Sequence, residues 1–167
     1  DDTAFAPDCG TPTSAAGIWY VYEDTTGLVT DILLSTCSTN TNYDTKISVY
    51  TGDCGAPPLT CVAGNDDSPN CTNFQSEVEF QSDGNTTYYI LVHGFGGATG
   101  DFELTMTCTP VPPPNDMIVN SIDVDEIGVP YTDPAVAMPA ATLENGNPTG
   151  CNIDGAKGVW YNFTAAA

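Results

Sequence analysis

The sequence predicts an all-β protein, an antiparallel β-sandwich or jelly roll that is stabilised by disulfides. Short runs of alternating or apolar residues recur along the first hundred positions, with turn residues between them. No stretch shows the 3.6-residue apolar period of an amphipathic helix. Seven cysteines stand among abundant Thr, Asn, Gly and Pro. This composition is typical of disulfide-bonded proteins from oxidising compartments.

Six strands are expected in the first hundred or so residues. The first two, 17–23 and 28–36, flank a turn at 24–27 and are predicted to form a hairpin. The segment 87–93 is apolar throughout, which predicts a central position in a sheet. The remaining expected strands are 45–50, 77–81 and 101–108.

A repeated string divides the chain. GIWY at 17–20 follows Cys9 at nearly the spacing with which GVWY at 158–161 follows Cys151. This recurrence predicts two copies of one module. We expect residues 1–108 to be the first copy, without its first strand, and 116–167 to be the N-terminal part of a second, truncated copy. The proline-rich residues 109–115 are expected to form a semi-rigid connector between them.

The charge excludes two classes of partner. The chain carries 22 acidic residues and two lysines, for a formal charge of −20. Nucleic-acid binding requires cations that replace phosphate counterions, and attraction to anionic membranes requires them too. No apolar run reaches the ~18–20 residues of a membrane span. A surface of this kind either serves solubility or collects Ca²⁺.

Several strings together resemble the pre-peptidase C-terminal-like (PPC-like) β-sandwich modules. The resemblance implies a jelly-roll-like sandwich in a multidomain extracellular protein, in which the module accompanies other activities and is not itself the enzyme. One departure is that Asn115-Asp116 is followed by Met117, where the module often has a cysteine shortly after the same pair. The strings that carry the resemblance are 17–20, 35–37, 43–54, 61–67 and 88–94.

The cysteines are expected to form disulfides, because their spacings do not fit zinc signatures and a single histidine cannot complete such a site. Cys54 and Cys61 bracket a short Pro-Pro loop and are expected to pair. Cys9 and Cys37 flank the expected hairpin, which leaves Cys71 for Cys108. Six cysteines allow fifteen pairings, among which the sequence alone does not decide.

Acidic turns near 65–67 are the candidate metal site. Asn65-Asp66-Asp67, with Asp44 and Asp53 on adjacent turns, could supply oxygen ligands to Ca²⁺. The alternative is a loop whose Asx side chains bond to their own backbone. No EF-hand spacing is present, and no other cofactor is indicated.

The sequence contains no recognisable catalytic motif, which predicts a protein that is not an enzyme. His93 ends an apolar strand, but neither a G-x-S-x-G elbow nor an HExxH pair accompanies it, so we interpret it as structural. The aromatic residues of 17–23 are expected to pack mainly in the core, although those on one face could stack on sugars. Asn70 and Asn85 begin sequons that matter in a eukaryotic source, and Asn162 begins a poorer one.

Two functions fit these features. The first is a structural or adhesive repeat of a secreted protein, a unit of an extracellular filament or cell-surface fibre. In it, the segment 118–124 would add a strand to a neighbouring copy head-to-tail. The second is an accessory module of a secreted hydrolase that binds carbohydrate or a surface. The residues of the expected donor strand that would face its neighbour are Ile118, Val119, Ile122 and Val124.

Overall fold

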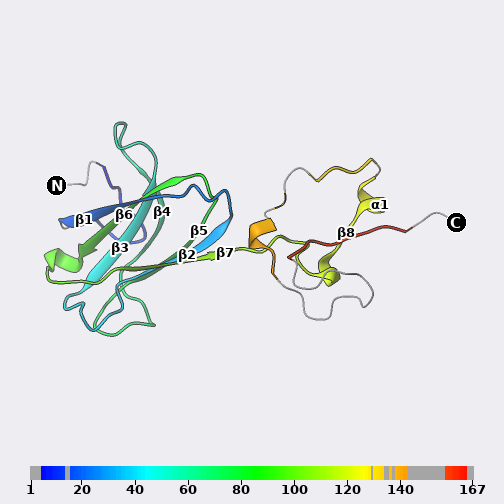
Figure 1. Ribbon diagram of the computed structural model, residues 1–167. Coiled ribbons are helices and arrows are strands. Elements are labelled where there is room, and N and C mark those ends of the chain that lie inside the picture. Colours follow the sequence, from blue (N-terminus) through cyan, green and yellow to red (C-terminus); the bar gives the residue numbers. More distant parts are fainter. Residues whose placement is uncertain are drawn as a thin grey trace. The chain divides into compact units, whose positions relative to one another are not determined.

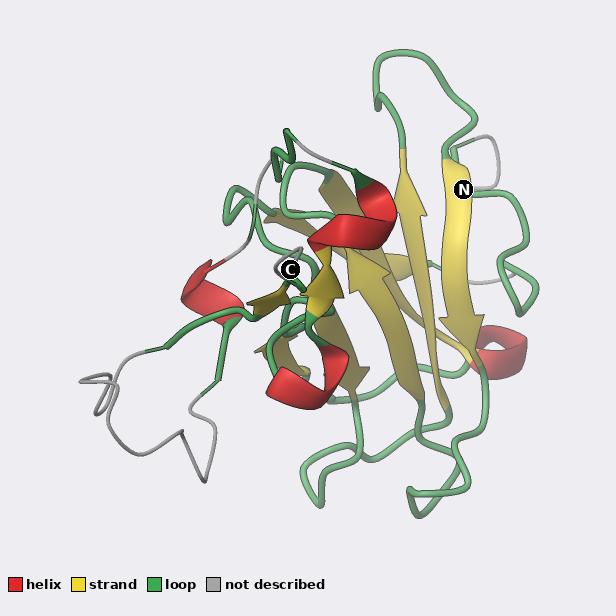
Figure 2. Ribbon diagram, turned by 90° about the vertical axis from the view of Figure 1, so that its right-hand side faces the viewer, coloured by secondary structure: helices red, strands yellow, loops and turns green. Residues whose placement is uncertain are grey.

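A computed structural model shows a chain built mainly from β-strands (Figures 1 and 2). It describes residues 5–13, 16–128, 130–133, 136, 138–142 and 157–164. Contacts divide the chain into unit 1, Asp1–Thr109, and unit 2, Pro110–Ala167. Helix in the described part is limited to turns of three or four residues. The all-β fold class is therefore confirmed.

The larger sheet of unit 1 has the strand order β1-β6-β3-β4. All of its strand pairs are antiparallel. β6 pairs on both edges, so the apolar run 87–93 does lie inside the sheet as predicted. The strands are β1 (Gly17–Glu23), β3 (Thr45–Thr51), β4 (Thr60–Asn65) and β6 (Thr87–Gly94).

The smaller sheet has the order β5-β2-β7 and faces the larger one across an apolar core. Its strands are β2 (Thr30–Ser35), β5 (Glu77–Ser82) and β7 (Thr105–Pro110). Because the core draws residues from both sheets, the two sheets pack as a sandwich. The buried core residues are Ile32, Leu34 and Val78 of the smaller sheet and Ile47, Val49, Tyr88 and Ile90 of the larger.

The predicted hairpin of the first two strands is wrong, because β1 and β2 belong to different sheets. The turn between them is bonded to the turn before β6. Asp24 N–H donates to the Thr86 carbonyl, and Gly27 N–H donates to the Gly84 carbonyl. These bonds fix the segment in which the chain crosses from one sheet to the other. β4 was not predicted, because its sequence, TCVAGN, has few apolar residues and its first half is exposed.

All three expected disulfide pairings are wrong. Cys9 pairs with Cys61 and Cys37 pairs with Cys71, whereas Cys54 and Cys108 are exposed free thiols. Cys61 lies opposite Tyr50 in the β3–β4 pair, and Cys9 of the N-terminal segment reaches it there. Cys151 lies outside the described residues.

Unit 2 does not form the strand predicted over 118–124. Ile118–Asn120 is a short 3-10 turn, Ile122–Asp123 is β8, and Val124–Ile127 is the helical turn α1. Asp123 caps α1 by accepting from the N–H groups of Asp125 and Glu126, an N-cap arrangement that ends the strand after two residues.

β8 pairs in parallel with β9 (Tyr161–Asn162) of the same unit, and a third 3-10 turn spans Met138–Ala140. Both ends of the connector predicted over 109–115 belong to folded structure instead. β7 extends to Pro110, and the buried Asn115 bonds to Trp160 through both its backbone and its side chain. In the described part of the chain, no helix is long and apolar enough to span a membrane.

Candidate functional site

The outer face of the β1-β6-β3-β4 sheet, which points away from the sandwich core, holds both candidate sites. Strand alternation directs Lys46, Ser48 and Tyr50 of β3 to this face, since Ile47 and Val49 enter the core. All three outward residues are nevertheless buried, so something must cover them.

The cover is the N-terminal segment 5–13. Its Cys9 is bonded to Cys61 of β4. The Tyr50 hydroxyl donates to the Pro7 carbonyl at 2.9 Å, and Lys46 Nζ donates to the Pro12 carbonyl at 3.0 Å. The first unit therefore does not leave this part of its sheet bare, although the sequence suggested that a strand was missing.

Three of the five predicted metal ligands come together at one end of this face. Asp44, Asp66 and Asp67 each offer a carboxylate oxygen within 4.8 Å of the other two. Asp53 lies apart on the turn after β3, where it accepts from Gly55 N–H at 2.7 Å. Asn65 is engaged elsewhere, because its Oδ1 accepts from Glu77 N–H at 3.3 Å.

Lys46 is part of the acidic cluster, although it was not among the predicted site residues. Its Nζ lies 3.7 Å from Asp66 Oδ2 and 5.3 Å from the centre of the Phe95 ring. A buried lysine requires a partner. Asp66 provides an opposite charge, and the Phe95 ring provides a cation–π contact. The available signal was its position: one of only two lysines falls inside an alternating strand.

The cluster retains capacity for a cation. Asp44 Oδ1 and Asp66 Oδ1 are buried and make no hydrogen bond within the protein. Burial, followed by the charges of Asp66 and Asp67, raises the pKa of Asp44, whereas Lys46 opposes this rise. Three carboxylates and one ammonium leave two negative charges, and hard oxygen ligands of this kind fit Ca²⁺.

His93 lies opposite Lys46 in the β3–β6 pair and is buried, an environment compatible with the structural interpretation. It is 1 % exposed, and its Nε2 is 3.3 Å from Ser48 Oγ. Burial, and then the charge of Lys46, lowers its pKa to about 4, while Asp66 acts in the opposite direction. The imidazole is therefore neutral at physiological pH.

The β1 side of the same face is open and forms a groove of about 320 Å³. Trp19 and Val21 of β1 point here, while Tyr22 packs against the core, as strand alternation predicted. Val21 is 58 % exposed. Trp19 packs at 5.8 Å, centre to centre, against the ring of Tyr50. The lining residues are Phe5, Trp19, Val21, Cys54, Leu59 and Tyr89.

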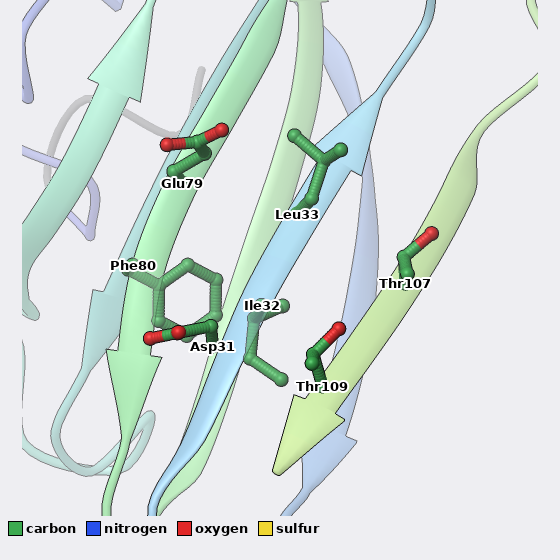
Figure 3. A pocket seen from close by; sticks show the side chains of 7 residues that line it. All are labelled: Asp31, Ile32, Leu33, Glu79, Phe80, Thr107 and Thr109. Atoms are coloured by element: carbon green, nitrogen blue, oxygen red, sulfur yellow. The ribbon is translucent and has the colours of Figure 1, made fainter. Parts of the chain in front are cut away.

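A second groove, of about 540 Å³, lies on the smaller sheet (Figure 3). It places the carboxylates of Asp31 and Glu79 beside apolar side chains and two threonines of β7. Asp31 accepts from the Gln81 amide at 3.0 Å. The only aromatic residue in the lining, Phe80, packs against Tyr88 at 4.9 Å between ring centres, so its ring serves the core. The remaining lining residues are Ile32, Leu33, Thr107 and Thr109.

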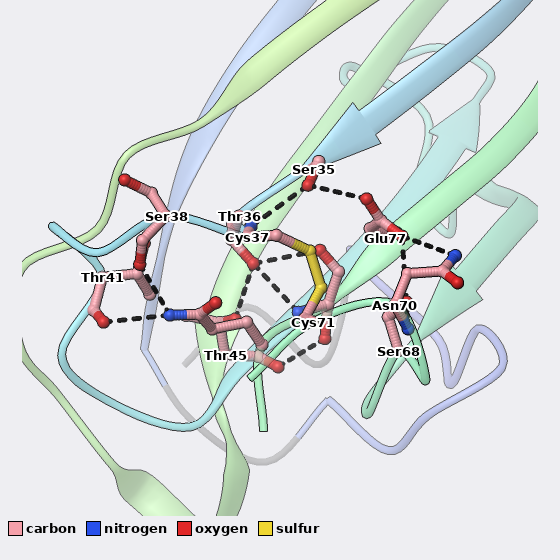
Figure 4. Close-up of a disulfide and its surroundings, with 12 residues drawn as sticks. Ser35, Thr36, Cys37, Ser38, Thr41, Thr45, Ser68, Asn70, Cys71 and Glu77 are labelled. Atoms are coloured by element: carbon pink, nitrogen blue, oxygen red, sulfur yellow. Dashed lines mark hydrogen bonds between the residues drawn. A yellow bond between two sulfur atoms is a disulfide. The ribbon is translucent and has the colours of Figure 1, made fainter. Parts of the chain in front are cut away.

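The Cys37–Cys71 disulfide stands in a polar network that includes the first sequon (Figure 4). Glu77 accepts from the Asn70 amide at 3.0 Å, and from the hydroxyls of Ser68 and Ser35. These bonds, led by that of Asn70, lower the pKa of Glu77 against the effect of burial.

The other two sequons differ in their surroundings. Asn85 is exposed on a turn, where its backbone N–H and side-chain amide both donate to Asp83. Asn162 lies in β9 and donates to Ser121 Oγ at 2.8 Å. Both asparagine side chains are exposed.

Comparisons with known protein families, with characterised proteins and with solved structures found no match to this chain.

Proposed function

We propose that this chain is a non-catalytic adhesive module of a secreted protein, which attaches that protein to an extracellular surface through the outer face of the β1-β6-β3-β4 sheet. The main support for this proposal is that one side of this face is covered and the other is open. A disulfide-bonded segment covers its β3 and β4 side, whereas its β1 side presents aromatic side chains in an open groove. Binding groups on a rigid scaffold lose little freedom when a ligand arrives.

The extracellular assignment is supported by covalent chemistry and charge. Two disulfides within about a hundred residues suit an oxidising compartment. A formal charge of −20 keeps copies of the chain apart in solution. The resemblance to PPC-like modules points in the same direction, because such modules accompany other activities in secreted proteins.

A repeat within an extracellular filament is the second candidate, favoured by the recurrence of GIWY as GVWY in a second unit. Strand exchange through 118–124 is a weak route to it, because Ile122 and Asp123 already pair with Tyr161 and Asn162. Further copies of the repeat in the parent reading frame, with filaments under the electron microscope, would favour this second candidate.

Co-sedimentation tests the adhesive function. Fluorescently labelled chain is mixed with insoluble cellulose, chitin, β-glucan, collagen and bacterial cell walls, and the bound fraction is measured after centrifugation. We expect binding to at least one material. Recovery of all the protein in every supernatant would refute the adhesive function.

A further inference from the structure

We propose that the groove on the β1 side binds a neutral saccharide, with a sugar ring stacked on Trp19 and Tyr89. This inference rests on the proposed adhesive function and names the ligand class of the groove. It follows from three features: how the aromatic rings are placed, which polar groups surround them, and what charge the protein carries.

Strand register places the two rings side by side. Trp19 is opposite Leu91 and Val21 is opposite Tyr89, so the two aromatic residues occupy a diagonal of the β1–β6 pair on one face. Such diagonal neighbours are about 7–8 Å apart. Val21, directly opposite Tyr89 and 58 % exposed, occupies the adjoining position on the same face. The rings therefore form a platform onto which the C–H face of a pyranose can be laid.

The platform is held in position by neighbouring side chains on the same face. Trp19 contacts the Tyr50 ring, and Tyr50 is fully buried and bonded to the Pro7 carbonyl. Leu59, at 4 % exposure, also lines the groove. A stacking residue whose orientation is fixed before binding loses less entropy on binding.

Polar groups surround the aromatic platform. Cys54 lines the groove with Tyr89, and a hydrogen bond to Cys54, then burial, then the charges of Cys54, Asp53 and Glu23 raise the pKa of Tyr89. Carboxylates accept hydrogen bonds from two hydroxyls at once. Sugars combine apolar C–H faces with hydroxyl edges, and this groove offers a matching surface for each.

The charge determines which saccharides fit. The charges of Asp53 and Glu23 act on Tyr89, and on a chain of formal charge −20 they repel uronic acids, sialic acids and sulfated sugars. An organic cation is the competing ligand, because aromatic rings and carboxylates also attract ammonium groups. Trp19 and Tyr89 point the same way from one sheet and form a floor rather than a cage, which favours the flat face of a sugar.

Tryptophan fluorescence provides the test. The chain has two tryptophans, so Trp160→Phe leaves Trp19 as the only reporter. This variant is titrated with neutral hexasaccharides from cellulose, chitin, mannan and xylan, with oligogalacturonate, and with tetramethylammonium chloride. We expect at least one neutral oligosaccharide to change Trp19 emission, equally at low salt and in 0.5 M NaCl, and oligogalacturonate to have no effect.

Calorimetry on variants locates the site. We expect Tyr89→Ala and Trp19→Ala to weaken binding by about tenfold or more. Because Trp19→Ala also removes a contact with Tyr50, Val21→Gln is the second variant. It changes an exposed residue, leaves the core intact and obstructs the groove, so it should weaken binding to a similar degree. Phe74→Ala removes an aromatic side chain that is 64 % exposed outside the groove and should leave affinity unchanged.

Three results would overturn the inference: no response to any neutral oligosaccharide, unchanged affinity in both Tyr89→Ala and Val21→Gln, or a response to tetramethylammonium alone. The co-sedimentation assay separates this failure from that of the adhesive function. Labelled chain that still sediments with collagen or cell walls, without binding oligosaccharides, is adhesive through another ligand.

Discussion

The two sides of the outer face of the β1-β6-β3-β4 sheet use the same strand alternation with opposite results. Over β3, the outward side chains Lys46, Ser48 and Tyr50 are buried under the segment 5–13. Over β1, the outward Val21 remains 58 % exposed at the aromatic groove. The covering segment, and not the strand pattern, decides which outward residues become a second core and which remain available to a ligand.

Removing the bond that holds this cover is expected to have the largest effect. Cys9 and Cys61 are 52 residues apart, and opening a loop of that length costs about 4 kcal/mol in chain entropy. We expect Cys9→Ser with Cys61→Ser to lower the free energy of unfolding in urea by this amount. Tyr50 should also become accessible to solvent.

Cys37→Ser with Cys71→Ser is the matched control. Its loop spans 34 residues, so the predicted loss is also about 4 kcal/mol, but Tyr50 should remain protected. Peptide mapping without reductant should recover both disulfides, and alkylation should label Cys54 and Cys108. A Cys54–Cys61 peptide would contradict the covered face.

Acidification should weaken the covered side next. Because the pKa of His93 is lowered to about 4 from 6.5, the unfolded chain binds more protons than the folded chain between these pH values. The contribution of His93 to stability is therefore complete above pH 6.5 and is lost as the pH falls towards 4. The loss is about 3 kcal/mol at most.

Urea unfolding from pH 7 to pH 4 measures this loss, with His93→Gln as the control, whose pH dependence should be weaker over that range. His93 is the only histidine in the chain, so its NMR titration needs no assignment. A midpoint near 6.5 would show that the imidazole is solvated and the cover open.

Replacing the buried Lys46 should also destabilise the covered side, by a smaller amount. Lys46→Met removes the ammonium that neutralises Asp66 and leaves three carboxylates together, so we expect a loss of about 2 kcal/mol, less than for a fully buried pair because Asp66 is partly exposed. The other lysine, Lys157, is exposed, and Lys157→Met should change stability little. Adding Asp66→Asn to Lys46→Met should restore part of the loss, and a double variant no more stable than Lys46→Met would argue against charge as the cause.

Calcium should have the smallest effect, and at the acidic cluster only. At a Ca²⁺ concentration about ten times the Kd, mass action adds about 1.4 kcal/mol to the free energy of unfolding. Melting scans with CaCl₂ and with EDTA should therefore differ by a few degrees. Asp67→Asn should abolish the difference, whereas Asp53→Asn, on a separate turn, should preserve it. Identical scans would mean that the cluster is only solvated surface.

Much of unit 1 was predictable because its strands carry local signals. The predicted strands overlap β1, β2, β3, β5, β6 and β7, and the opposite orientations of Trp19 and Tyr22 follow from alternation alone. β4 was missed, because its exposed and weakly apolar sequence becomes a strand only by pairing with β3. The sequence did not distinguish the three candidate metal ligands that meet, Asp44, Asp66 and Asp67, from the two that do not. Lys46 could not be added to them without the register.

The sequence by itself determined the class of the fold, the acidic composition and the alternation of side chains along the predicted strands. These depend on neighbours along the chain. The tertiary structure decided the two disulfide pairings, the assignment of β1 and β2 to different sheets, the cover formed by 5–13 and the groove beside it. All of these bring together residues that are tens of positions apart, and the pairings that unite them are selected by the packing of the whole sandwich rather than by any local pattern.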